Sequence, residues 1–133
     1  MKKIIRIRLS LGAVLITVIM SCEKNNTLYI KPRPVAVTFS VSLSKDLVPI
    51  FTKSCALNGC HPSGGKAPDL SADNAYNSLI NGKFIDKAAP ESSIVYKRLT
   101  GSLTPAMPMG APANPSNIEG LILAWIKQGA KKN

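Results

Sequence analysis

The only histidine of the chain directly follows one of two closely spaced cysteines. The segment is Cys55-Ala56-Leu57-Asn58-Gly59-Cys60-His61. It gathers two thiols and an imidazole in one short stretch, so the metal-binding and thiol chemistry of the chain converges there. With 133 residues the chain is long enough for one domain and too short for two domains with separate cores. A single small domain must therefore position this cluster, and a multidomain enzyme is excluded.

Two cysteines followed at once by a histidine are typical of covalent c-type haem attachment. In that chemistry Cys55 and Cys60 form thioether bonds to the porphyrin, and His61 ligates the iron from the proximal side. The usual spacer between the cysteines is about two residues, and here it is four residues. The extra residues must loop out, and Asn58-Gly59 are residue types that tolerate such a turn. The sequence therefore predicts one covalently bound haem c.

Three other kinds of site use the same residue types. A disulfide between Cys55 and Cys60 fits an exported protein, but it gives His61 no role. A zinc site lacks a fourth ligand, because the chain has no second histidine and no second cysteine pair. A nucleophilic Cys-His dyad has poor geometry, because adjacent residues rarely bring a thiol and an imidazole face to face. Haem attachment is favoured over all three, and the disulfide stays open as the alternative.

The N-terminal segment predicts export. Residues 9–20 form an apolar run that follows four basic residues and ends at Ser21-Cys22, which is the layout of a bacterial signal peptide. The run is too short to span a membrane comfortably. A small residue followed by cysteine at the end of such a run is typical of lipoproteins, in which the cysteine is lipidated. We therefore expect a signal peptide over residues 1–21 and a lipid on Cys22, with an uncleaved anchor helix as the alternative.

The charge balance is basic. The chain has 17 Lys and Arg against 7 Asp and Glu, a net charge of +10, and without residues 1–21 the count is 13 against 7, or +6. No aromatic-basic strip or binding motif accompanies this charge, so we expect no nucleic-acid partner. For a haem protein, exposed basic residues instead predict a redox partner with an acidic docking face. The candidates are Lys53, Lys66, Lys83, Lys97 and Arg98, and an ordinary solvated surface is the alternative explanation for them.

The second axial position of the iron has two candidate ligands. The chain has no second histidine, so the strong candidates are methionine thioethers. Met1 and Met20 belong to the expected signal peptide, which leaves Met107 and Met109. Both lie in the segment 103–115, where four prolines exclude regular structure. The alternative role for both is to fill gaps in the core.

The rest of the chain predicts short helices. Residues 22–44 look like a tether with a strand-like alternation from Val35 to Leu43. Helical spacing then begins at Leu47, with Ile50 and Phe51 on the same face, and runs into the cysteine cluster. The next expected helices run from Ser71 or Asp73 to Leu79 or Ile80, closed by Asn81-Gly82, and from Pro90 to Gly101.

The C-terminal helix has the clearest pattern. Ser116 and Glu119 fit a capping box, and an apolar stripe follows until Gly129. The stripe is Ile118, Leu121, Ile122, Trp125 and Ile126. Such a stripe must be buried, and the expected partner is the apolar face of the helix that starts at Leu47. Gly120 would allow the two backbones to approach closely.

Several of these segments together resemble the small cytochrome c domains of Bacteroidetes and Planctomycetes. Members of that family often carry a Cys-x4-Cys-His motif and a Met-Pro-Pro distal loop ahead of a terminal Trp-Ile-x-x-Gly-Ala helix. The matching segments are Ser44 to Phe51, Cys55 to His61, Pro90 to Tyr96, Met107-Pro108 and Ala124 to Ala130. One departure is that Met-Pro-Pro is replaced by Met107-Pro108-Met109. The resemblance favours Met107 as the distal ligand, with Met109 as the alternative.

The resemblance implies a mostly α, class I cytochrome c-like helical domain over residues 45–131, with a long proline-rich distal loop. Its function would be one-electron transfer by a monohaem c-type cytochrome, not enzymatic catalysis, at the periplasmic side of a membrane or at the cell surface. If the distal methionine is absent, a haem-based sensor of small ligands or a peroxidase is the alternative. If haem is absent, the alternative is a disulfide-stapled surface module that binds a partner.

Overall fold

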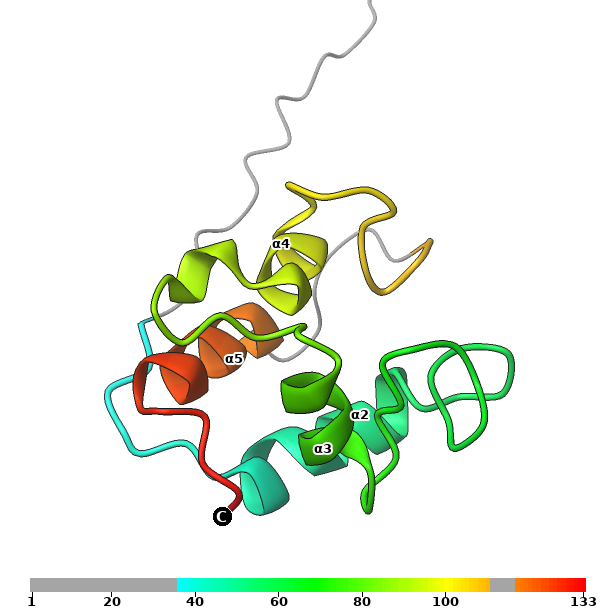
Figure 1. The fold of residues 1–133 in the computed structure, drawn as a ribbon, viewed down its shortest axis with the longest axis horizontal. Coiled ribbons are helices and arrows are strands. Elements are labelled where there is room, and N and C mark those ends of the chain that lie inside the picture. The colour runs from blue at the N-terminus through cyan, green and yellow to red at the C-terminus, as the bar shows by residue number, and fades with distance from the viewer. Residues whose placement is uncertain (1–35, 111–116) are drawn as a thin grey trace, which may run out of the picture. The chain divides into compact units, whose positions relative to one another are not determined.

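The regular elements in the described part of the chain are all helical (Figure 1). The computed structural model describes residues 36–110 and 117–133, and no strand occurs in these two ranges, so the mostly α class is confirmed. Four α-helices are present there: α2 (Val48–Ser54), α3 (Ala75–Asn81), α4 (Ile94–Thr100) and α5 (Ile118–Lys127). A π-helical turn (Leu43–Leu47) leads into α2, and a 3₁₀ turn (Pro90–Ser92) precedes α4. Within these ranges no helix has the length and apolar composition needed to cross a membrane.

Helical geometry begins earlier than the apolar spacing predicts. The Ser42 side chain accepts from the backbone N–H of Lys45 at 3.2 Å, and the Ser42 N–H donates to the Asp46 carboxylate at 2.7 Å. This reciprocal pair satisfies donors at the start of the π-helical turn in the manner of a capping box. Pro49 then lies in the first turn of α2, where its missing N–H breaks no helical hydrogen bond. The helix consequently runs without a break to Ser54, and Cys55 follows as its C-cap.

Glycines end two of the helices as expected. Gly82 caps the C-terminus of α3, and Gly101 caps α4 in the left-handed conformation with a φ of 75°. A residue with a Cβ is disfavoured at such a φ, which is why glycine marks this type of helix end. Pro90 starts a 3₁₀ turn and α4 itself starts at Ile94, so the expected helix is present in two pieces.

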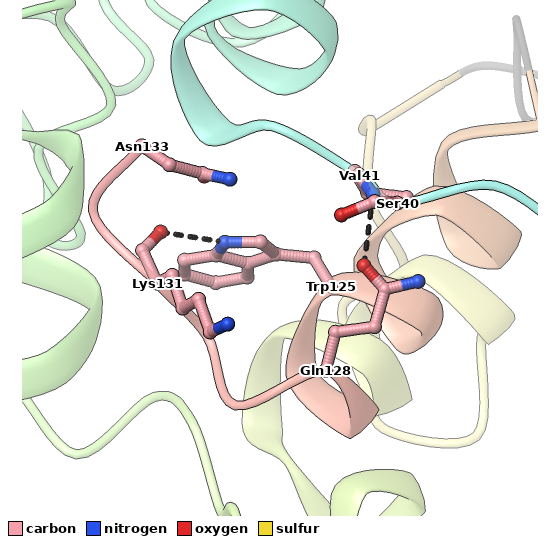
Figure 2. A pocket seen from close by; sticks show the side chains of 6 residues that line it. All are labelled: Ser40, Val41, Trp125, Gln128, Lys131 and Asn133. Atoms are coloured by element: carbon pink, nitrogen blue, oxygen red, sulfur yellow. Dashed lines mark hydrogen bonds between the residues drawn. The ribbon is translucent and has the colours of Figure 1, made fainter.

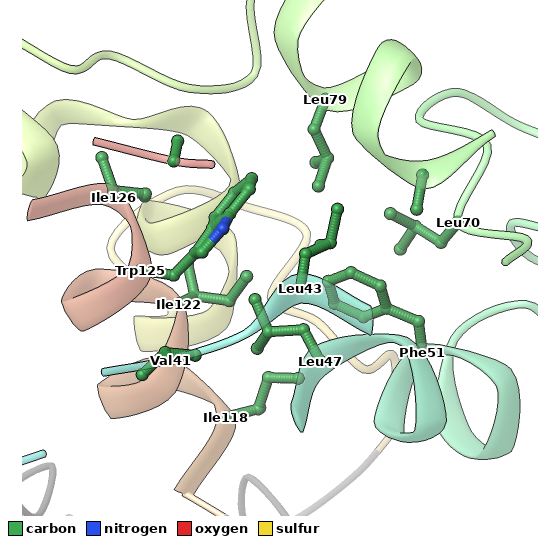
Figure 3. Packing of buried hydrophobic residues seen from close by; sticks show 12 residues of the cluster. Val41, Leu43, Leu47, Phe51, Leu70, Leu79, Ile118, Ile122, Trp125 and Ile126 are labelled. Atoms are coloured by element: carbon green, nitrogen blue, oxygen red, sulfur yellow. The ribbon is translucent and has the colours of Figure 1, made fainter. Parts of the chain in front are cut away.

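The core is built around α5. Trp125, Ile122 and Ile126 are almost fully buried together with Leu47 and Phe51 from the N-terminal segment (Figure 3). α5 lies against the π-helical turn, against α4 and against the 3₁₀ turn. The expected packing against the Leu47 face is therefore confirmed for the π-helical turn, and α4 is a second partner that the apolar spacing does not predict.

The start of α5 differs from the prediction by one residue. Its N-cap is Asn117, which has a φ of 50°, and Ile118 is the first helical residue. The capping-box pattern places the N-cap at Ser116, which lies outside the described residues. Asparagine tolerates the left-handed region better than most residues. Asn117 therefore takes the N-cap position and leads the chain into α5.

The expected strand-like segment is wrong for the described part, residues 36–43. Val41 and Leu43 are buried, but Phe39 is 54% exposed, so the alternation does not hold along the segment. No neighbouring strand is described for it, and the Gln128 side chain takes that place. Its Oε1 accepts from the Val41 N–H at 2.8 Å, and its Nε2 donates to the Phe39 carbonyl at 3.0 Å. Figure 2 shows Gln128 beside Val41 and Trp125, where they line a small pocket.

Trp125 should be the most costly side chain of α5 to remove. It is 1% exposed, and its Nε1 donates to the Lys131 carbonyl at 2.9 Å. Trp125→Ala should lower the free energy of unfolding by about 3–5 kcal/mol, because it leaves a large cavity. Trp125→Phe retains part of the ring volume and should cost less. Thermal unfolding measures both, and an unchanged midpoint for Trp125→Ala would contradict the packing role.

Candidate functional site

The segment between Cys55 and His61 closes into a short loop at the end of α2. Cys55 is the C-cap of α2, and its backbone N–H donates to the Phe51 carbonyl at 2.8 Å. Its own carbonyl accepts from the backbone N–H of His61 at 3.1 Å. Inside the loop, the N–H of Cys60 donates to the Leu57 carbonyl at 2.9 Å. These bonds bring the two ends of the segment together.

The extra spacer residues form the turn that their types predict. Gly59 has a φ of 79°, in the left-handed region where glycine has no steric penalty. A Cβ at Gly59 would meet no atom within 4 Å, so the requirement for glycine comes from the backbone conformation alone. Leu57, Asn58 and Gly59 are exposed. The wide cysteine spacing is therefore accommodated by an outward bulge that leaves the helix unchanged.

His61 is held in one orientation by its neighbours. Its Nδ1 lies 3.0 Å from the Lys66 carbonyl, and its own carbonyl accepts from the Leu70 N–H at 2.8 Å. A carbonyl only accepts, so a neutral His61 carries its proton on Nδ1 and keeps the lone pair on Nε2. Proteins commonly orient a metal-ligating histidine through such a bond from its other ring nitrogen. His61 is half-buried, and its ring is thereby prepared to ligate through Nε2.

The two cysteines are free thiols in different environments. Cys55 is half-buried and Cys60 is exposed. Burial, and secondarily the charge of Cys60, raises the pKa of the Cys55 thiol to about 11. Cys55 therefore stays protonated at neutral pH, which makes it a poor nucleophile and disfavours a Cys-His dyad. Among the described residues no group of three or more His, Cys, Asp and Glu side chains is placed to hold a metal ion.

Asp69 anchors the far end of the loop to α3. Its Oδ1 accepts from the backbone N–H of Ser71 at 2.9 Å and from the Ser71 hydroxyl at 2.6 Å, and its Oδ2 accepts from Asn74 at 2.9 Å. These hydrogen bonds, the one from the Ser71 hydroxyl first, hold the pKa of Asp69 below its usual value. The next residue, Leu70, is buried in the core and donates to the His61 carbonyl. The loop is thus fixed at both ends.

Met107 and Met109 lie on a different loop, residues 101–110, which follows α4. Met107 is half-buried, and its N–H donates to the Arg98 carbonyl at 2.9 Å. Met109 is 70% exposed. Figure 1 shows this loop and the loop of residues 55–70 extending as separate loops on the same side of the view. The structure therefore joins Cys55 and His61 by a backbone hydrogen bond, holds Cys60 within the same loop, and carries the methionines on another loop.

The remaining candidates are the basic residues of the expected docking surface and the expected lipidation site, Cys22. Lys53, Lys66 and Lys83 are exposed, and Lys97 is half-buried. Arg98 is also half-buried, and its guanidinium donates to the Pro105 carbonyl at 3.0 Å, which is a different use from the expected docking surface. Cys22 lies outside the described residues.

Sequence analysis named Lys66 and Arg98 only as docking residues, and it missed the contact of the Lys66 carbonyl with His61, the contact of Arg98 with Pro105, and the role of Asp69. The Asp69-x-Ser71 pattern is a local turn signal that predicts part of this arrangement. Nothing local marks the other two contacts, because each depends on how a loop folds back.

Comparison with protein-family models, with curated proteins and with solved structures finds no match to this chain. The residues of the site and their geometry therefore carry the interpretation.

Asp69 should make the stability of this loop pH-dependent. A carboxyl whose pKa is lowered by folding contributes stability above its unfolded pKa and loses it as the pH falls through the folded pKa. Asp69→Asn should therefore lower the unfolding midpoint at about pH 6, and the difference from wild type should shrink toward about pH 3. Asp73→Asn removes an exposed carboxylate nearby and should change the midpoint little at about pH 6. A difference that stays constant with pH would refute the role of the Asp69 charge.

Proposed function

We propose that this chain is a monohaem c-type cytochrome that carries one electron at a time. The observation that supports it best is the 3.0 Å contact between His61 Nδ1 and the Lys66 carbonyl. That contact leaves Nε2 of a neutral His61 to act as an iron ligand. The same short loop holds two free cysteine thiols. Two thiols and an oriented imidazole are the donor set that a covalently attached haem requires.

Cys55 and Cys60 would hold the porphyrin by adding their thiols to its two vinyl groups. In each addition the sulfur bonds to one vinyl carbon and the thiol hydrogen goes to the other, so no oxidant or reductant is consumed. The loop supports this role because a backbone hydrogen bond ties His61 to Cys55, and the hydrogen bonds of Cys60 to Leu57 and Lys66 hold it in the same loop. The Gly59 turn absorbs the two extra spacer residues. A four-residue spacer is therefore compatible with attachment at both cysteines.

Met107 is the proposed distal ligand. It is half-buried and its backbone is fixed to α4, whereas Met109 is 70% exposed. Haem c supplies an iron that gains or loses one electron without making or breaking a bond in a substrate. If His61 and Met107 both held the iron, the protein would leave no open position for a substrate. This supports a carrier and not an enzyme, and a thioether ligand raises the reduction potential.

The proposed setting is a membrane surface outside the cytoplasm. The basic and apolar N-terminal pattern that ends at Ser21-Cys22 supports export and a lipid on Cys22. The exposed Lys53, Lys66 and Lys83 support a redox partner with an acidic docking face. Nucleic acid is not a proposed partner, because no binding motif accompanies the basic residues.

A pyridine haemochrome spectrum tests the proposal directly. The full chain, produced in a host that matures haem c, should carry one haem per chain. The mass of the protein should rise by the mass of the covalently bound haem. The double variant Cys55→Ser/Cys60→Ser should carry no covalent haem, whereas Leu57→Ala, which changes an exposed spacer residue, should carry a full complement. A wild-type chain without haem, two hydrogens lighter than the dithiol, would instead be the disulfide-stapled surface module.

The two methionines should differ in their effect on the ferric spectrum. Met107→Ala should abolish the sulfur-to-iron charge-transfer band at the red end of the spectrum and lower the reduction potential, because the thioether is lost. Met109→Ala should leave the band intact, since the Met109 side chain is mostly exposed. The opposite result would assign the ligand to Met109. Loss of the band in neither variant would mean that the iron has no methionine ligand, as in a small-ligand sensor or a peroxidase.

A further inference from the structure

Arg98 contacts the Met107 loop through both its side chain and its backbone. The Arg98 guanidinium donates to the Pro105 carbonyl at 3.0 Å. The Arg98 carbonyl accepts from the Met107 N–H at 2.9 Å. These two bonds lie on either side of Ala106. One residue of α4 therefore fixes the backbone directly before Met107 and at Met107 itself.

The first part of the loop is also fixed to the last turn of α4. Gly101 turns the chain back with a φ of 75°. The Leu103 N–H and the Ser102 hydroxyl then both donate to the Lys97 carbonyl, at 3.1 and 3.3 Å. As a result, residues 101–107 stay close to the C-terminal end of α4 (Figure 1). Among these contacts, the Arg98 guanidinium is the charged donor, and hydrogen bonds from charged groups are stronger than neutral ones.

We infer that Arg98 is a positioning residue for the distal ligand and acts by fixing the loop backbone at Pro105 and Met107. This inference rests on the proposed function, in which Met107 ligates the iron. A thioether on a loop ligates the iron firmly only if the loop holds the sulfur in one place. Ordering a mobile loop costs conformational entropy each time the sulfur–iron bond forms. The guanidinium bond reduces that cost. Of these two hydrogen bonds it is the one that a substitution removes, since the bond to the Arg98 carbonyl stays in any variant.

A role in helix stability alone is the competing explanation. A basic residue in the last turn of a helix interacts favourably with the helix dipole, and α4 has two of them, Lys97 and Arg98. Lys97 therefore provides a matched control. It carries the same charge at the adjacent position, and it holds the loop through its backbone carbonyl, which an alanine retains. Only a positioning role predicts different results for the two substitutions.

The experiment compares Arg98→Ala, Arg98→Lys and Lys97→Ala in the haem-loaded full chain. Three quantities are measured: haem content by pyridine haemochrome, the ferric charge-transfer band, and the Kd for added imidazole, which competes for the distal side of the iron. Haem content should be unchanged in all three, because it depends on Cys55, Cys60 and His61. Arg98→Ala should weaken the charge-transfer band and bind imidazole about 3-fold more tightly, as expected for the loss of a solvent-exposed charged hydrogen bond. Lys97→Ala should match wild type.

Arg98→Lys is the rescue variant, and it keeps the test decisive if Arg98→Ala does not fold. A lysine ammonium can donate to the Pro105 carbonyl but lacks the planar fork of arginine, so its imidazole Kd should lie between wild type and Arg98→Ala. If Arg98→Ala fails to fold, a Kd shift in Arg98→Lys without one in Lys97→Ala still supports the inference. Wild-type values for both Arg98 variants would overturn it.

The failures of the two proposals are distinguishable in the same samples. A wild-type chain without covalent haem would overturn the cytochrome proposal, and this inference with it. A wild-type chain with haem but without the charge-transfer band would overturn methionine ligation and the role of Arg98, and would leave covalent haem attachment intact. Equal shifts in Arg98→Ala and Lys97→Ala would assign the effect to the charge at the end of α4 and also overturn the inference.

Discussion

The loop between Cys55 and His61 must close on itself while both of its ends stay fixed to the helical core, and backbone carbonyls meet this requirement. The Cys55 carbonyl accepts from His61 at one end, and the His61 carbonyl accepts from Leu70 at the other. The Lys66 carbonyl then orients the His61 ring. Because α2 ends at Ser54 and Leu70 is buried, the loop cannot shift without disturbing the core. The position of the candidate site therefore follows from the packing of the helices on either side of it.

None of the fully buried core residues is a candidate ligand, although the half-buried Cys55 packs against them. The largest buried side chains of the core, including Trp125, Phe51 and Leu47, belong to α5, α2 and the π-helical turn. Three of the four described α-helices have only seven residues, a length at which an isolated helix is marginal. Packing against neighbouring elements must therefore supply much of their stability, and α5 is such a neighbour for α4. This division agrees with a common arrangement in which a rigid scaffold presents functional residues on its loops.

The sequence predicted the elements whose signals are local. The apolar stripe of α5, the glycine ends of α3 and α4, and the turn at Gly59 are all encoded within a few neighbouring residues, and all are present. The strand-like segment was wrong because alternation indicates a strand only when a second strand is available, and here the Gln128 amide takes its place. The contacts of Lys66 and Arg98 were not predictable, because each arises where a loop returns to an element and no pattern of residue types marks that return.

The separate anchoring of the two loops has a consequence for the proposed cytochrome. The loop of His61 is fixed to α2 and to the buried Leu70, whereas the loop of Met107 is fixed to the end of α4. Loosening the α4 contacts would therefore free the distal side of the iron and leave the proximal side and the thioether bonds in place. An electron carrier and a small-ligand sensor would then share every element of this chain except the contacts that hold residues 101–107 against α4. If the chain binds haem as proposed, the choice between these two functions would depend on the stability of one loop and not on the fold.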